Sequence, residues 1–200
     1  LPGLYHGDDF DLVGFIVGAV ERDEIIDGSR IQKGDVILGI PSNGLHTNGY
    51  SLVRMVFQVE AHPEVLETYY PQLGRRLGEA LLEPHRSYYP ILKEHLPSIK
   101  GMAHITGGSF SKNVPRVLPQ GLAARIQTGS WEVPPLFKLI QEKGSITSDE
   151  MYRVFNMGIG MVVICDAAHG SALKKRIAGA VEIGSVVAQK GDAQVELVGL

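Results

Sequence analysis

The stretch "GDVILGIPSNGLHTNGYSLVR", residues 34–54, decides the fold expected for this chain. Its apolar run over residues 36–41 predicts a short buried strand that is closed by a proline. Apolar side chains then recur at helical spacing, which predicts an amphipathic helix over residues 50–59. A polar, glycine-rich loop over residues 42–49 connects the two. The stretch therefore predicts a strand–loop–helix unit, which is typical of an α/β domain.

Strands and helices alternate along the rest of the chain. We expect further strands at residues 10–20, 101–106, 160–165, 182–188 and 194–199, the last two as a closing pair. We expect further helices at residues 73–82, 84–96, 134–144, 148–155 and 171–180. Thr147 and Glu150 have the spacing of a capping box at the start of one of these helices. The fold class expected is α/β (α+β), a layered mixed sheet with flanking helices.

Composition narrows the function classes. The chain has 200 residues, a net charge of −3 and no basic run, which argues against nucleic-acid or membrane-surface binding. Cys165 is its only cysteine, so an intrachain disulfide and a cysteine-based zinc site are excluded and a reducing, cytoplasmic compartment is expected. No apolar run reaches the roughly 20 residues of a membrane helix. The chain begins at Leu1 without an initiator Met, so we expect it to be a piece of a longer protein.

The loop after residues 36–41 is the first candidate site. It has the glycine spacing of a phosphate-binding P-loop, but Tyr50 stands where that motif needs a lysine, so we reject the P-loop interpretation. A strand-to-helix turn still directs backbone N–H groups at one point, which favours anion binding. His46 adds a group that titrates near neutral pH. A well-capped helix with a solvent-facing His46 is an equally good interpretation. The candidate residues are Ser42, Asn43, Gly44, His46, Thr47, Asn48 and Gly49.

A second loop, "HITGGSFSKNVPRVLP" over residues 104–119, repeats this design. A predicted strand runs into two glycines and a serine, and positive charge at Lys112 and beyond would suit a phosphate or carboxylate. A plain glycine-rich turn is the alternative. The candidate residues are Gly107, Gly108, Ser109, Asn113 and Arg116. A third glycine-rich segment, residues 155–160, is explained adequately by close packing at the start of a strand.

Two polar clusters are weaker candidates. His6, Asp8, Asp9 and Asp11 could bind Mg²⁺, with Asp11 as the best ligand, although an exposed acidic turn is an alternative. A surface ion pair would explain the neighbouring residues Glu83, His85 and Arg86. The sequence shows no nucleophile–base spacing and no His/Cys spacing of a zinc site.

Taken together, these segments resemble the aminoimidazole ribonucleotide synthetase family, also called phosphoribosylformylglycinamidine cyclo-ligase, of purine biosynthesis. The resemblance covers nearly the whole chain and rests on segments that match in type, spacing and order. They are "LPGLYHGDDFDLVGFIVGAVE", "GDVILGIPSNGLHTNGYSLVR", "LGEALLEPHRSYYPIL", "AHITGGSFSKNVPRVLP", "FNMGIGMVV" and "IGSVV". Two positions depart from the family pattern: Ser109 stands where a third glycine is usual, and Lys112 stands where an acidic residue is common.

The resemblance implies a two-domain enzyme of which this chain is the carboxy-terminal portion. Residues 1–33 would be the end of an amino-terminal domain for ATP binding and dimerisation, plus a linker, and residues 34–200 a carboxy-terminal α/β domain. The implied reaction is the ATP-dependent ring closure of formylglycinamidine ribonucleotide, with Mg²⁺, in a cytoplasmic homodimer. The implied role of the two loops, with His46 as the catalytic candidate, is to hold phosphate groups of ATP or substrate. A non-catalytic phosphate-binding or partner-binding module, or a related synthetase or kinase, are the alternatives.

Overall fold

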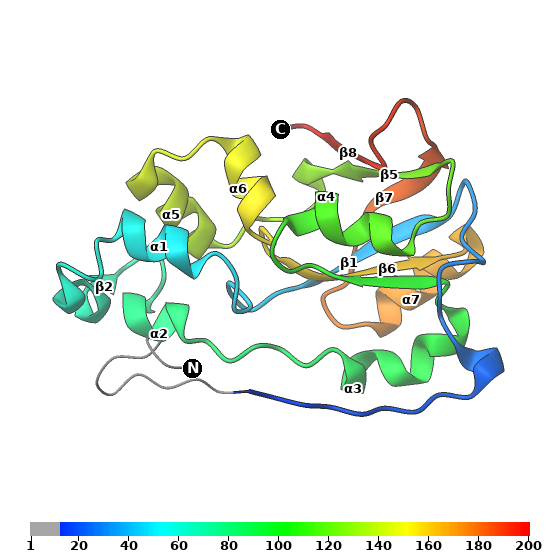
Figure 1. The fold of residues 1–200 in the computed structure, drawn as a ribbon, viewed down its shortest axis with the longest axis horizontal. Coiled ribbons are helices and arrows are strands. Elements are labelled where there is room, and N and C mark those ends of the chain that lie inside the picture. The colour runs from blue at the N-terminus through cyan, green and yellow to red at the C-terminus, as the bar shows by residue number, and fades with distance from the viewer. Residues whose placement is uncertain (1–12) are drawn as a thin grey trace, which may run out of the picture.

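The computed structural model of the chain describes residues 13–200, and a six-stranded mixed sheet is its centre (Figure 1). The strand order is β4-β6-β1-β7-β5-β8, and every pair is antiparallel except β5 with β8. These strands are β1 (Val36–Pro41), β4 (Gly101–His104), β5 (Leu122–Gln127), β6 (Ile159–Cys165), β7 (Val181–Ala188) and β8 (Val195–Val198). With helices on its faces, this sheet confirms the predicted layered α/β fold.

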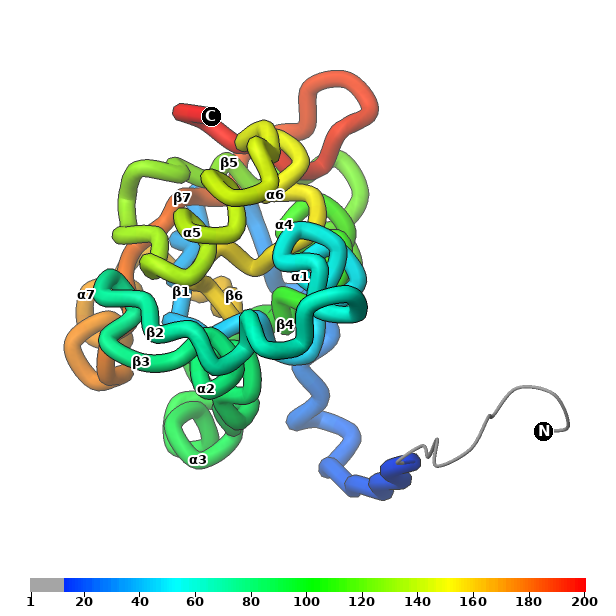
Figure 2. The backbone as a smooth tube through the Cα atoms, turned by 90° about the vertical axis from the view of Figure 1, so that its left-hand side faces the viewer, coloured from blue at the N-terminus to red at the C-terminus, as the bar shows by residue number. Residues whose placement is uncertain are grey.

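Both faces of the sheet are covered by an apolar core. Successive side chains of a strand point to opposite sides, so one strand can contribute to both cores. In β1, Ile37 packs into one apolar core while Leu38 packs into the other. The first core receives side chains from α1 (Tyr50–Val56), α2 (Leu77–Leu81), α4 (Ser109–Asn113), α5 (Pro135–Gly144) and α6 (Ser148–Val154). The second core is closed by α3 (Tyr89–Leu92) and α7 (Ala167–Arg176). Figure 2 shows α3 and α7 apart from α5 and α6, so the domain has three layers.

Three predicted helices form close to their expected bounds. They are α1, α5 and α6, in which the apolar residues fall on the side that faces the first core. The hydroxyl of Thr147 accepts a hydrogen bond from the Glu150 amide, as expected of the residue that caps α6. Gly144 is the last residue of α5, and Ser145 adopts the left-handed conformation after it, with φ 49°.

Other predicted elements differ in the structure. The expected helix at 73–82 is shortened to α2, because the chain before it forms a small hairpin of β2 (Tyr69–Tyr70) and β3 (Arg75–Arg76). The expected helix at 84–96 is only α3 followed by a 3-10 turn, in a segment that contains Pro90 and Pro97. The last predicted helix, α7, begins and ends about four residues earlier than expected. The 3-10 turns are Arg22–Glu24, Pro63–Glu67, Lys93–Ser98, Val114–Val117 and Thr128–Ser130.

The predicted buried strand at residues 10–20 is wrong over the part that the structure describes. Residues 13–20 form no strand, and their large side chains are exposed, with Phe15 at 92%. Among residues 13–200 they have no sheet to join, and in Figure 2 this segment lies apart from the body of the domain. The predicted pairing of the last two strands is also wrong, because β5, which sequence analysis missed, lies between β7 and β8. Over residues 13–200, no helix has both the length and the apolar character needed to span a membrane.

An almost buried ion-pair cluster fixes one end of the sheet. Lys100 lies just before β4, Asp35 just before β1, and Asp166 at the start of α7. The Lys100 ammonium lies 2.8 Å from the Asp35 carboxylate and 2.6 Å from the Asp166 carboxylate. Burial lowers the pKa of Lys100, but hydrogen bonds and charges from Asp166 and Asp35 outweigh it, so the net direction is upward. The hydrogen bond from Lys100 in turn lowers the pKa of Asp166. The cluster therefore binds three segments together through charge.

Candidate functional site

Three glycine-rich loops meet at one end of the sheet. Strands β1 and β4 are both antiparallel to β6, so the end of β1, the end of β4 and the start of β6 lie at the same edge. The loop after β1 is residues 42–49, the loop after β4 is residues 105–108, and residues 155–158 precede β6. The topology therefore gathers both predicted phosphate loops in one place.

Asn156 connects the first and third loops from a buried position. Its Nδ2 donates to the Gly44 carbonyl at 3.0 Å, and its Oδ1 accepts from the Ser42 hydroxyl at 2.9 Å and from the Gly158 amide at 2.8 Å. The Ser42 amide also donates to the Gly158 carbonyl at 2.8 Å. Sequence analysis favoured a packing role for the third segment, and the structure gives Asn156 the role of a tie between two loops.

Asn48 and Asn113 hold the second loop. Asn48 Oδ1 accepts from the Gly107 amide at 2.9 Å, which joins the loop after β1 to the loop after β4. Asn113 lies inside the turn, where its Nδ2 donates to the Ser109 carbonyl at 2.7 Å. Both amide side chains therefore shape the backbone of the loops.

The backbone of these loops is strained. His46 and Thr47 have φ of 53° and 61°, a left-handed conformation that is uncommon for residues with a Cβ, and Ser109 has φ 52°. Such residues cost of order 1–3 kcal/mol each and cluster at functional sites. Gly49 (φ 77°) could not be replaced easily, since a Cβ there would lie 2.2 Å from the Phe155 ring. Gly108 continues the pattern with φ 88°.

A hollow of about 300 Å³ opens between the first two loops. Gly49 lies on one side, Gly107 and Gly108 on the other, and Lys112 and Arg153 bring positive charge to its wall. Within residues 13–200, the Gly108 amide donates no hydrogen bond. The Ser109 hydroxyl is also buried without a partner there. The Gly108 amide and the Lys112 ammonium at this small hollow suit an anion such as phosphate, while the Arg153 guanidinium is held by the Glu150 carboxylate at 2.6 and 2.7 Å.

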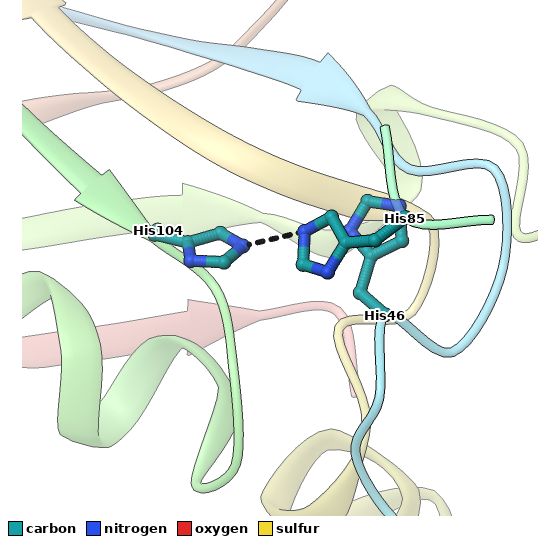
Figure 3. A group of neighbouring side chains, drawn as sticks. All are labelled: His46, His85 and His104. Carbon is teal, nitrogen blue, oxygen red and sulfur yellow. Dashed lines mark hydrogen bonds between the residues drawn. The ribbon is translucent and has the colours of Figure 1, made fainter. Parts of the chain in front are cut away.

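His46, within the first loop, is buried and not solvent-facing. Its Nε2 lies 2.5 Å from Asn43 Oδ1, and its ring stacks on His85 at 4.0 Å between centroids, with His104 beyond (Figure 3). Burial, followed by the charges of His85, His104 and Arg86, lowers the pKa of His46 to about 4. His46 is therefore neutral at pH 7 and brings no positive charge to the loop.

Asn43, Thr47 and Arg116 do not line this hollow. Asn43 Nδ2 donates to the Pro84 carbonyl at 2.6 Å, and Thr47 Oγ1 donates to the carbonyl of His46 at 2.6 Å. Arg116 is exposed and lines a different hollow, beside His104. Asp11 lies outside the described residues.

Sequence analysis missed Arg153, because nothing in α6 marks it as a neighbour of a loop some 45 residues earlier. It also missed the cluster of His46, His85 and His104, which come from three separate segments. The ion pair suggested for Glu83 does form, but with Arg75 rather than with its sequence neighbours.

The fold and the site define a class: a three-layer α/β domain whose glycine-rich turns gather, with cationic side chains, at one edge of a mixed sheet. The chain belongs to the family described as "AIR synthase related protein, C-terminal domain", which matches residues 32–196.

Curated relatives show which members of this family the chain is similar to. The chain is 52% identical over 166 residues to a phosphoribosylformylglycinamidine cyclo-ligase of Caldicellulosiruptor bescii, covering 82% of this chain and 49% of the relative. It is 48% identical over 205 residues to the cyclo-ligase of Methylobacillus flagellatus, covering 99% and 58%. The chain thus spans about half the length of the curated relatives it matches.

Solved structures share the fold at low identity. Thiamine-monophosphate kinase from Stenotrophomonas maltophilia matches with a TM-score of 0.59 and 14% identity, over 90% of this chain and 55% of that one. The hydrogenase maturation protein HypE in complex with ATP matches with a TM-score of 0.59 and 14% identity, over 88% and 51%. These likenesses support the fold class and nothing finer.

Proposed function

We propose that this chain is the carboxy-terminal portion of a cyclo-ligase that closes the ring of formylglycinamidine ribonucleotide to aminoimidazole ribonucleotide at the expense of ATP. The observation that carries the proposal is the hollow between the two glycine-rich loops, with Lys112 and Arg153 on its wall. The name shared by the curated relatives supplies the reaction. The HypE structure solved with ATP supports a nucleotide as co-substrate, since that protein shares the fold.

The chemistry requires positioning more than a reactive side chain. ATP supplies a phosphoryl group to the formyl amide oxygen, which is otherwise a poor leaving group, before the amidine nitrogen attacks and phosphate departs. Positioning and charge neutralisation supply most of the catalysis of such transfers. In this proposal the amides of the loops at Gly49 and Gly108, with Lys112, hold phosphate oxygens. His46 is placed to accept a hydrogen bond at Nδ1, which is buried without a partner among the described residues.

Mg²⁺ does not fit the described hollow. The residues that line it are three glycines, a valine, Lys112 and Arg153, and none carries a carboxylate. Oxygen ligands are what Mg²⁺ requires. We therefore assign Mg²⁺ to ligands outside this hollow, with Asp11 as the candidate in this chain, and no step of the proposal depends on the ion.

The domain division and the dimer are part of the same proposal. Residues 1–33 are assigned to an amino-terminal domain and its linker, and residues 34–200 to the carboxy-terminal domain. The exposed apolar side chains of residues 13–20 support this, because they would be buried by a sheet supplied by that domain. We place the intact enzyme in the cytoplasm as a homodimer that takes ATP and the ribonucleotide as its small-molecule partners.

The direct test is kinetic. Replacing His46 and Asn48 by Ala in the complete protein is expected to lower turnover at least tenfold, about 1.4 kcal/mol of barrier. The reason is that Asn48 fixes the Gly107 amide and His46 supports the strained turn. Steady-state kinetics with both substrates would measure it, with His62→Ala as the control, since His62 is exposed and lies away from the loops. Unchanged kinetics in a folded double variant would reject the role.

A non-catalytic phosphate-binding module is the second candidate, because no carboxylate, hydroxyl or thiol side chain lines the hollow. Calorimetry of the 200-residue chain with ATP and with substrate analogues tests it. Ring closure by this chain alone would refute the need for an amino-terminal domain. A related kinase or synthetase activity would be found by screening substrates on the complete protein.

A further inference from the structure

Three histidines from distant parts of the chain converge beside the first loop (Figure 3). His46 lies in the loop after β1, His85 in the irregular segment before α3, and His104 at the end of β4. One ring nitrogen of each lies within 4.8 Å of one ring nitrogen of the others, and the Nε2 atoms of His85 and His104 are 3.0 Å apart. His85 and His104 are exposed, so the cluster is open to solvent on one side.

The tautomer of His46 suits a ligand. Its Nε2 has two neighbours, Asn43 Oδ1 at 2.5 Å and the Asn43 amide at 3.2 Å, and it cannot donate to one while accepting from the other. The shorter contact is the stronger, so Nε2 carries the hydrogen and donates to Oδ1. The lone pair then falls on Nδ1, which is buried and has no partner among residues 13–200. An acceptor that fixes the second ring nitrogen, as Asn43 Oδ1 does here, is the usual support of a metal-bound histidine.

We propose that His46, His85 and His104 form a binding site for a first-row transition-metal dication such as Zn²⁺. Three neutral imidazoles are a ligand set that such ions prefer, and a solvent molecule would complete the coordination. Mg²⁺ is excluded as the occupant, because it requires oxygen ligands.

The ion needs one local movement. Zn–N bonds of about 2.0–2.1 Å place tetrahedral ligand nitrogens roughly 3.3 Å apart, and the three nitrogens here lie within 4.8 Å of one another. Since stacked rings cannot direct their lone pairs at a common point, the His85 ring turns out of its stack with His46. The exposure of His85 makes this movement inexpensive. Arg86 opposes the ion through its charge, although its guanidinium is occupied by the Pro41 carbonyl at 3.3 Å, so we expect micromolar rather than structural affinity.

The test uses the metal alone. Titration of the metal-free chain with ZnCl2 by calorimetry, and with CoCl2 by visible absorption, is expected to show one ion per chain and the spectrum of a nitrogen-bound ion. His85→Ala and His104→Ala are expected to weaken binding at least tenfold. His62→Ala, which removes an exposed histidine elsewhere, should leave it unchanged. Circular dichroism establishes that each variant is folded.

Two results would overturn the site: no binding at millimolar metal, or binding that is equally tight in folded His85→Ala and His104→Ala variants. His46 belongs to both proposals, but the two tests use different variants and ligands. The titration contains neither ATP nor ribonucleotide, and His85 does not line the hollow between the glycine-rich loops. If the loops prove not to bind phosphate, the metal titration still tests the histidine site. If the metal does not bind, the kinetic test of the loops is unaffected.

Discussion

Replacing Lys100 by Met is expected to lower the free energy of unfolding by about 3–5 kcal/mol, the usual cost of removing one partner of a buried ion pair. Asp35 is 2% exposed, and its carboxylate receives two hydrogen bonds from the Lys100 ammonium, at 2.8 and 3.0 Å. The Met side chain fills similar volume but leaves that carboxylate charged and buried. Urea denaturation of the wild type and the variant measures the difference.

Arg125→Met is the matched control, because the Arg125–Glu196 pair is partly exposed and should contribute less than about 1 kcal/mol. Restoring neutrality with Asp35→Asn in the Lys100→Met background should recover part of the loss. A cost below about 1 kcal/mol for Lys100→Met would show that the cluster does not bind the three segments together.

The same cluster predicts a pH dependence. The pKa of Asp166 is lowered in the fold, so its stabilisation is present above its unfolded pKa and is lost as the pH falls through the folded one. The pKa of Lys100 is raised, so its contribution is complete below its unfolded pKa and is lost only as the pH rises through the folded one. The difference in stability between wild type and Lys100→Met should therefore shrink at both acid and strongly alkaline pH.

Replacing Asn156 by Ala is expected to cost about 2–4 kcal/mol, because three hydrogen bonds of roughly 1 kcal/mol each are lost and their partners stay buried. Those partners are the Gly44 carbonyl, the Ser42 hydroxyl and the Gly158 amide. Beyond stability, hydrogen exchange of the Gly158 amide should quicken selectively, since it loses its acceptor.

Gln120→Ala is the control for this variant, because Gln120 is exposed and its carboxamide makes no hydrogen bond within residues 13–200. A loss for Asn156→Ala no larger than that of the control would mean that the loops are held by their backbones alone. Exchange that quickens equally throughout the domain would point to global destabilisation rather than to a loosened loop.

The fold could be predicted where local pattern and tertiary environment agree. The apolar run of β1 and the helical spacing of α5 bury the same side chains in the structure that the pattern selects. The prediction failed for residues 13–20, because apolar composition predicts burial but cannot say whether the burying surface is in the same piece of chain. Strand β5 was missed because Arg125 and Gln127 interrupt its apolar pattern at a sheet position next to the edge.

The two glycine-rich loops of the candidate site could be predicted from the sequence, but their neighbours in the fold could not. Glycines after a predicted strand indicate a turn that can approach a ligand, and parallel β1 and β4 bring two such turns to one edge. Arg153 and the three histidines could not be found from spacing, because only the folded sheet makes neighbours of positions so far apart in sequence. The role of Asn156 in connecting two loops could not be predicted either, since the Gly44 carbonyl to which it donates is a backbone atom of another loop.

The most direct measurement is a crystal structure of the complete protein with a non-hydrolysable ATP analogue and a substrate analogue. The account predicts phosphate oxygens within hydrogen-bond distance of main-chain amides in the 42–49 and 107–109 turns, with Lys112 or Arg153 beside one of them. Both turns without ligand, and the phosphates bound elsewhere on a well-ordered complex, would contradict it.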